Sequence, residues 1–492
     1  MRLLLPILLL AICGLPVFAQ MPKVSTGVPH DLAIWRAAHY SDVRYKLNLT
    51  LEKMSPVLKG TIEIRVNVTP GTQASPPASP PSGETPPIIL DWRKITGHEK
   101  DSTISNLVVN GTPAVPTHEG IAPLSEPQYH EASDHIVIFG GVKPGENVIK
   151  LDFTSPILTS GSAMTRYIDK EDGSEYLYSL FVPSDASTAF PVFDQPDLKA
   201  RFTLSITEPL SWTVVSNTLG KNDPYFDVVD MPGQKEPPPH RILFEETKPI
   251  STYVFAFAAG PWQEFDSTGG NPSSSEGAPR PSGTLPTGRV SATAAEALSN
   301  HIYVRKSQAA KFQPHAAETF RLMREGVKYL EDYFDYKFPW PKYDLVLIPE
   351  FPFGGMEHAG ATFVREASII FPSEPTANDY ISRANLIFHE TAHQWFGDTV
   401  TMRWFDDLWL KEGFAEFMAF KTLEKVMPQY NAWKAFYERN KQAAYLTDST
   451  KGTTPIYQPI ENLSAAKSAY GNIVYRKAPS FLRQAEFYLG PE

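Results

Sequence analysis

Two histidines and a glutamate stand in the pattern His-Glu-x-x-His within the 492-residue chain, as His389, Glu390 and His393. On an α-helix, residues four apart lie one turn above each other on one face, so both imidazoles could bind one zinc ion. Glu390 lies beside them, where its carboxylate could act as a base. Residues 382–388 favour a helix, and Gly397 can end it. The alternative is that the histidines only pack on an apolar helix face, since a long chain can contain this pentapeptide by chance.

A glutamate on the next predicted helix could complete the ligand set. A catalytic zinc site takes three protein ligands and keeps one position for water. Glu412 lies within residues 407–426, whose pattern predicts a helix that would hold its carboxylate rigidly. The alternative, a solvated helix carboxylate, is disfavoured by the apolar neighbours Leu408, Trp409 and Phe414.

Four stretches of the chain resemble, in the same order, motifs of one family. The run from His389 to Phe417 is similar to that of the zinc aminopeptidases that include alanyl aminopeptidase (aminopeptidase N) and the leukotriene-hydrolase branch. Residues 354–358 resemble the family's Gly-x-Met-Glu-Asn motif, residues 475–478 its tyrosine segment, and residues 190–196 its Phe-Pro-Cys-x-Asp-x-Pro stretch. The resemblance, to gluzincins with the pattern HExxH-x18-E, implies a zinc peptidase with a thermolysin-like catalytic domain and two histidines and a glutamate as ligands.

The resemblance also implies roles for residues outside the metal set. Glu390 would be the general base that takes a proton from the zinc-bound water and passes it to the leaving amine. Tyr475 would donate a hydrogen bond to the oxyanion, and Tyr470 is its local competitor. The substrate-binding residues would be Gly354, Gly355, Met356 and Glu357, with the last binding the free α-amine of a peptide.

Glycines without side chains let the backbone approach a peptide closely, although a tight turn would explain Gly354 and Gly355 equally. The chain departs from the family pattern at three positions. His358 replaces an asparagine, Val182 stands where a second amine-binding Gln or Glu is expected, and Val192 replaces a cysteine. The first two departures predict weaker anchoring of the amine.

Composition excludes some partners and sets the scale of the fold. The formal net charge is −10 and no basic run occurs, so no nucleic-acid partner is predicted. The expected partners are peptides with a free amino terminus. A length of 492 residues is enough for about three average domains.

The first residues predict export. Residues 1–19 have a short basic start, an apolar run and a small-residue cleavage signal, which is typical of a signal peptide. A periplasmic or extracellular location is therefore expected, with a lipoprotein anchor at Cys13 as a minor alternative. Cys13 is the only cysteine, so the mature protein would have no disulfide, and no later stretch is apolar enough to span a bilayer.

The order of patterns predicts a multi-domain α+β protein. Alternating apolar residues predict one antiparallel, β-sandwich-like domain over residues 20–265, with a Pro/Ser-rich insertion at 71–87. Residues 266–290 predict a flexible loop. Residues 291–492 predict the thermolysin-like metallopeptidase domain, beginning with a helix over residues 316–334.

The chain is also expected to be a carboxyl-terminally truncated member of the family. An apolar stripe on a predicted helix at 481–489 lacks a following segment to pack on. The function predicted from the whole sequence is a zinc-dependent aminopeptidase. The alternatives are a thermolysin-like endopeptidase, a non-catalytic binding homologue, or epoxide hydrolysis as in the leukotriene branch.

Overall fold

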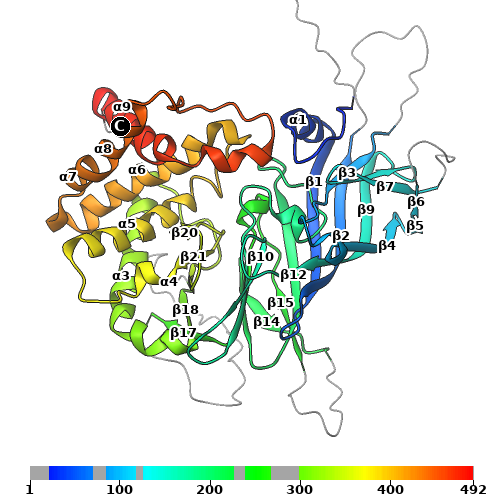
Figure 1. The fold of residues 1–492 in the computed structure, drawn as a ribbon, viewed down its shortest axis with the longest axis horizontal. Helices are drawn as coiled ribbons and strands as arrows, with labels where there is room; N and C mark the ends of the chain where they lie inside the picture. The colour runs from blue at the N-terminus through cyan, green and yellow to red at the C-terminus, as the bar shows by residue number, and fades with distance from the viewer. Residues whose placement is uncertain (1–20, 70–84, 118–125, 227–238, 268–298, 491–492) are drawn as a thin grey trace, which may run out of the picture.

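The computed structural model describes residues 21–69, 85–117, 126–226, 239–267 and 299–490. A β-rich part, on the right of Figure 1, lies beside a part in which helices cover a smaller sheet. This arrangement confirms the multi-domain α+β prediction. The predicted signal peptide lies outside the described residues, as do most of the predicted insertion and most of the predicted loop.

The largest sheet has eight strands and includes the predicted alternating strands. In β1 (Tyr40–Thr50), Tyr45, Leu47 and Leu49 are buried while intervening residues face outward, which is the period-two pattern of a half-buried strand. The strand order is β14 (Gly220–Asn222), β15 (His240–Phe244), β12 (Ala200–Glu208), β1, β2 (Val57–Val68), β9 (Gly145–Pro156), β4 (Thr103–Val109) and β5 (Thr112–Pro113).

The prediction that this part is antiparallel throughout is wrong at two pairs. β1 and β12 run parallel, with Leu47 opposite Leu204, and β6 (Val115–Pro116) and β7 (Gln128–Ala132) also run parallel. Strands distant in sequence carry no local signal of their relative direction, so alternation alone could not show this.

Two four-stranded sheets complete the β-rich part. One has the order β10 (Met164–Ile168), β11 (Glu175–Ser179), β16 (Phe257–Gly260) and β13 (Thr213–Ser216). The other has the order β3 (Ile88–Asp91), β8 (His135–Phe139), β7 (Gln128–Ala132) and β6 (Val115–Pro116). A short helix, α1 (His30–His39), precedes β1 and buries Leu32 and Trp35.

The second part contains a mixed five-stranded sheet. Its order is β17 (Trp262–Asp266), β18 (His301–Arg305), β19 (Asp344–Ile348), β21 (Ala361–Arg365) and β20 (Gly355–Met356). The predicted boundary after Phe265 therefore falls inside β17, which pairs with β18 rather than with the preceding sheets. The prediction assigned this strand to the β-rich part because it directly follows the other predicted strands in sequence.

Helices pack around this sheet and carry most of the second core. The helices are α3 (Ala309–Phe334), α4 (Glu366–Ile369), α5 (Ala377–His393), α6 (Leu408–Val426), α7 (Ala432–Phe436), α8 (Gln442–Asp448) and α9 (Ala478–Leu489). α3 begins earlier than the predicted residue 316, with Pro314 inside it, although proline normally marks a helix start. None of the described helices is long and apolar enough to cross a bilayer.

The two parts meet through hydrogen bonds between buried groups. Asn217 Nδ2 donates to the carbonyl oxygens of Val254 and Ala359, both at 2.9 Å, and so links the two parts. The Tyr253 hydroxyl donates to the carbonyl of Gly397, just beyond α5, at 3.1 Å. The β-rich part therefore fixes the loops that flank α5 and β20.

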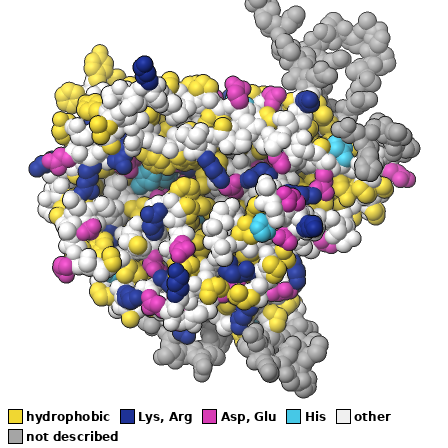
Figure 2. All heavy atoms as spheres, viewed as in Figure 1, with side chains coloured by type: hydrophobic (Ala, Val, Ile, Leu, Met, Phe, Trp, Pro, Cys, Tyr) yellow, Lys and Arg dark blue, Asp and Glu magenta, His cyan; other side chains and the backbone are white. Residues whose placement is uncertain are grey.

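The end of α9 exposes apolar side chains. Phe487, Tyr488 and Leu489 are 87%, 88% and 76% exposed. Hydrophobic side chains gather over this region at the upper left of Figure 2. The predicted apolar stripe is thus only partly covered, since Leu482 packs against the second core while Tyr488 does not.

Candidate active site

α5 places His389, Glu390 and His393 at its carboxyl end. The helix begins with a capping box, in which the Thr376 hydroxyl accepts from the Asp379 N–H and the Asp379 carboxylate accepts from the Thr376 N–H. The side chains of His389, Glu390 and His393 are all buried. As the spacing predicts, the two imidazoles lie one turn apart, with ring centroids 4.6 Å apart.

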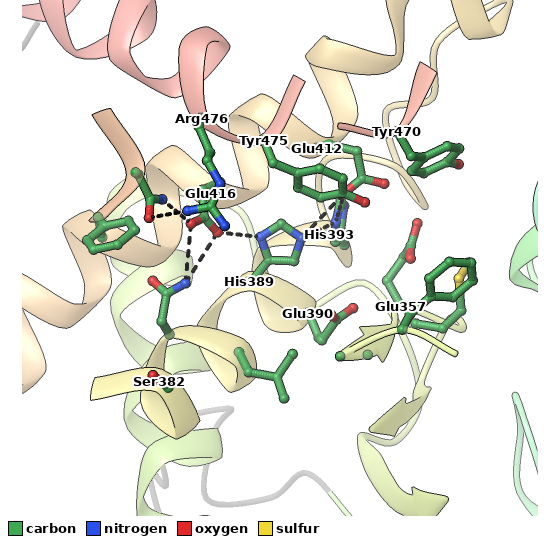
Figure 3. Close-up of a pocket in the computed structure, with 18 of the residues that line it drawn as sticks. Glu357, Ser382, His389, Glu390, His393, Glu412, Glu416, Tyr470, Tyr475 and Arg476 are labelled. Atoms are coloured by element: carbon green, nitrogen blue, oxygen red, sulfur yellow. Dashed lines mark hydrogen bonds and ion pairs between the residues drawn. The ribbon is translucent and has the colours of Figure 1, made fainter. Parts of the chain in front are cut away.

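α6 brings Glu412 to the two histidines. Glu412 Oε2 lies 3.3 Å from His389 Nε2 and 3.2 Å from His393 Nε2, and the two Nε2 atoms are 3.0 Å apart. Glu412 is 3% exposed, so the alternative of a solvated carboxylate is wrong. The histidines and the glutamate converge on one point in Figure 3.

These three donor atoms fit a tetrahedral metal ion. Ligand atoms about 2.0–2.1 Å from zinc in a tetrahedron lie about 3.3 Å apart, close to the separations observed. His389 Nδ1 lies 3.0 Å from a Glu416 carboxylate oxygen, and His393 Nδ1 lies 2.9 Å from the Phe396 carbonyl oxygen. Both oxygens only accept, so each Nδ1 carries a hydrogen and each Nε2 is the atom that can bind a metal ion at the shared point.

The electrostatics of the cluster also favour a cation. Burial opposes the charge of Glu412, yet the Lys411 ammonium and the two imidazoles hold the pKa of its carboxyl well below the usual range. Burial lowers the pKa of His389, but bonds to Glu412 and Glu416 outweigh it and raise that pKa well above the usual value. A site that attracts protons to this extent can exchange them for a metal ion.

Glu390 lies beside the cluster with a free carboxylate oxygen. Its Oε2 is buried and lacks a hydrogen-bond partner among the described residues. Burial raises the pKa of the Glu390 carboxyl to about 8, against the opposing effect of His389. A divalent cation between the ligands would lower that pKa again.

Glu416 is a site residue that the sequence analysis missed. Besides facing His389, its carboxylate accepts a 2.7 Å hydrogen bond from Asn440 Nδ2 and a 3.2 Å bond from Asn385 Nδ2. Glu416 stands four residues after Glu412 on α6, so the same helical spacing that relates the two histidines could have indicated it.

The glycine-rich stretch lies against Glu390 as well as along the cleft. A Cβ at Gly355 would lie 2.3 Å from Glu390 Oε1, whereas one at Gly354 would meet only Leu386, at 3.2 Å. The absence of a side chain at Gly355 therefore makes room for Glu390, a different reason from the close peptide approach that was predicted. Met356 and Glu357 follow at the end of β20, and both line the cleft.

Glu357 has a partner that the sequence analysis did not anticipate. Lys411 Nζ lies 2.6 Å from Glu357 Oε1 and 3.0 Å from Glu412 Oε1. Val182 lines the same cleft and adds no charge there. His358 is fully buried, and burial lowers its pKa to about 3, so the imidazole that replaces the expected asparagine is neutral.

Tyr475 stands over His389, with ring centroids 6.1 Å apart, and its hydroxyl end points into the cleft in Figure 3. It lies on the π-helical turn η9 (Ile473–Lys477), directly before α9. A Cβ at Gly413 would lie 2.7 Å from the Cβ of Ala478, so this glycine allows α9 to approach α6 closely. The predicted competitor, Tyr470, also lines the cleft.

All predicted site residues therefore border a single cleft of about 500 Å³. Residues of α5 and β20 line one side of the cleft, and residues of α6 and η9 line the other side. Figure 2 shows a hollow below the helices, with histidine side chains visible inside it. Arg439 and Arg476 also line this cleft.

Comparison with known proteins identifies matches along most of the chain. Residues 319–492 match the model of the peptidase family M1 domain, and residues 90–254 match that of the peptidase M1 N-terminal domain. The chain is 33% identical to aminopeptidase N of Streptomyces lividans over 362 residues, which is 73% of this chain and 38% of that relative.

Two further relatives give the same picture. The chain is 31% identical over 336 residues to alanine/arginine aminopeptidase of Saccharomyces cerevisiae, covering 68% of this chain and 35% of the relative. It is 30% identical over 315 residues to leucyl aminopeptidase of Saccharolobus solfataricus, covering 63% and 35%. The chain thus spans well under half the length of these relatives.

Proposed function

Because the chain belongs to peptidase family M1, we propose that it is a zinc-dependent aminopeptidase, which removes amino-terminal residues from peptides. The observation that carries this proposal is the convergence of three buried donor atoms, from two helices, within 3.3 Å of one another. His389, His393 and Glu412 would hold the ion, and Glu390 lies beside them.

The metal ion and the residues around it would each assist a different step of peptide hydrolysis. Zinc would polarise the scissile carbonyl and lower the pKa of a water molecule to about 7. Glu390 would accept the proton of the attacking water with its unpartnered oxygen and deliver it to the leaving amine. Burial raises the pKa of Tyr475 well above its usual value, so its hydroxyl keeps the hydrogen that it would donate to the carbonyl oxygen.

Glu357 supports exopeptidase action. It is 3% exposed, borders the cleft and points toward the cluster from β20, opposite α6. A carboxylate at this place would bind the α-ammonium of a peptide and obstruct a chain that continues past it. Gly354, Gly355 and Met356 would form the adjoining backbone surface for the substrate.

A panel of aminoacyl amides, each with and without an acetyl group on the amine, tests the proposal with the zinc-loaded chain. We expect cleavage of free substrates and a large loss for acetylated ones. Similar rates on both forms would favour the endopeptidase alternative. Absence of turnover on every substrate, in protein that retains one zinc, would favour a binding homologue instead.

We also propose export of the chain from the cytoplasm, on the pattern of residues 1–19. Expression of the full chain in a bacterial host, followed by fractionation and amino-terminal sequencing, tests this. A mature protein that begins at Gln20 in the periplasm or medium is the expected result. An intact Met1, or a lipid on Cys13, would contradict this cleavage site.

A further inference from the structure

Lys411 is a buried cation between two carboxylates of the cleft. It is 2% exposed, and its Nζ lies 2.6 Å from Glu357 Oε1 and 3.0 Å from Glu412 Oε1. Glu412 uses its other oxygen, Oε2, to face the histidines. Lys411 therefore contacts Glu412 on the side away from the metal-binding point and extends from there to Glu357.

The surroundings hold the ammonium group in this position. Nζ lies 4.6 Å from the ring centre of Tyr253 and 5.8 Å from that of Tyr470, within the range of cation–π attraction. These two aromatic rings and the two carboxylates leave the lysine little freedom to withdraw. Figure 3 shows the Glu357 carboxylate on the β20 side of the cleft, pointing toward Glu412 and Tyr470 on the other side.

The charge balance at Glu357 follows from this contact. Glu357 Oε1 already forms an ion pair with an ammonium group, at 2.6 Å, although the geometry is not that of a hydrogen bond, and Val182 in the same cleft supplies no second negative charge. A substrate α-ammonium that reaches Glu357 must share the carboxylate with Lys411, and two like charges at such separation repel strongly in a buried site.

We infer that Lys411 is a specificity-determining residue, which partly neutralises the amine subsite and so reduces the preference for a free amino terminus. The inference rests on the proposed function, because it assumes that Glu357 receives the substrate amine. It predicts that this chain tolerates substrates with an uncharged amino end better than a subsite with an unpaired Glu357 would.

Matched ligands with and without an amine allow the effect of Lys411 on amine binding to be measured separately from catalysis. L-Leucinol and 4-methylpentan-1-ol differ at the amine and are not hydrolysed, so calorimetry on the zinc-loaded chain gives their dissociation constants directly. The ratio of the two constants measures the amine preference. It would be determined for the wild type and for Lys411→Met, Lys411→Gln, Lys411→Arg and Glu357→Gln.

We expect the amine preference to rise about tenfold or more in Lys411→Met and Lys411→Gln, and to stay at the wild-type level in Lys411→Arg. Glutamine is uncharged but keeps N–H donors on its side chain, which keeps the test valid if methionine disturbs the fold. With leucine anilide as substrate, the neutral variants should lower KM more than they change kcat. A residue that only supports the fold would not raise the amine preference.

An unchanged preference in both neutral variants would overturn the inference. If Glu357→Gln still abolished the wild-type preference in that case, the proposed amine role of Glu357 would stand and only the role of Lys411 would fall. If neither the wild type nor any variant preferred leucinol, the amine role of Glu357 and the inference would fall together. Zinc content, measured for every variant, separates these effects from loss of metal.

Discussion

Glu416 Oε2 lies 3.0 Å from His389 Nδ1, on the side of the imidazole opposite the Nε2 atom that faces Glu412. This contact fixes the tautomer of His389 and the orientation of its ring. Asn385 and Asn440 in turn hold the Glu416 carboxylate. The geometry of the proposed metal site therefore depends on a polar network that reaches from α5 through α6 to η7 (Tyr437–Lys441).

Replacing Glu416 by alanine should weaken zinc binding by about 10–100-fold, the usual effect of removing a residue that orients a metal ligand. Competition with a fluorescent chelator measures the affinity. Glu424→Ala is the matched control, because Glu424 is exposed on the same helix. Equal affinity in the two variants would show that the network does not orient His389.

The roles of Glu412 and Glu390 can be separated by measuring metal content and rate together. Glu412→Ala should lose most of the zinc, because it removes one of three donor atoms. Glu390→Gln keeps the shape of the side chain but cannot accept a proton, so it should retain zinc and lose about 10²–10⁴-fold in kcat. Elemental analysis and steady-state kinetics check both. A Glu390→Gln variant without zinc would make Glu390 a ligand.

Gly355→Ala should reduce kcat more than it affects stability. The new Cβ would lie 2.3 Å from Glu390 Oε1 and would force this carboxylate out of position. Gly354→Ala is the control, since its Cβ would meet only the Leu386 side chain, at 3.2 Å. We expect a loss of kcat of at least tenfold in the first variant alone, with zinc retained in both. Comparable kinetics would mean that Glu390 can move aside without consequence.

A buried acid in the β-rich part should make stability depend on pH. Asp194 is fully buried, and its N–H donates to Asp91 Oδ2 at 2.7 Å. Burial and the charge of Asp91 raise the pKa of Asp194 from 3.8 to about 7. The folded state thus keeps a proton that the unfolded state releases above about pH 4, so stability falls as pH rises from about 4 to 7 and levels off above that.

Asp194→Asn should remove this contribution, which amounts to about 1.4 kcal/mol per unit of pKa difference. Thermal melts between pH 4.5 and 8 check the prediction. The variant should lose stability less steeply than the wild type as pH rises, whereas parallel curves for the two proteins would contradict a protonated Asp194 in the folded state.

The exposed end of α9 should cause self-association of protein made from residues 20–492. Phe487, Tyr488 and Leu489 are each more than 75% exposed, and a contiguous apolar patch promotes aggregation. Changing all three to serine should reduce the binding of an apolar-surface dye and the apparent mass in light scattering, without loss of zinc. A wild-type chain that is already monomeric and does not bind the dye would refute this.

The sequence was most informative where chemistry and local periodicity coincide. The helix over His389 and the glutamate on the following helix could be predicted because helical spacing and metal chemistry constrain the same few residues. Lys411 was not predicted, because a lysine beside a ligand has many possible partners. Its contact with Glu357 depends on how β20 packs beside α6.

The same limit explains the errors in the fold. The burial pattern of β1 followed from alternation, but its parallel pairing with β12 depends on the route of the chain between them. Glu416 differs from these cases, since it lies one helical turn after Glu412. A search for a carboxylate partner for each imidazole would have identified it.

Gly413, next to Glu412, determines how closely α9 approaches α6 beside the cleft. Because Ala478 packs directly against this glycine, the distance between α6 and α9 is set by contact rather than by a flexible side chain. Glu412 directly precedes Gly413, and Tyr475 precedes Ala478 by three residues. The separation between the Glu412 carboxylate, a proposed metal ligand, and the Tyr475 phenol therefore depends on this contact. A larger side chain at Gly413 would change the positions of both groups together.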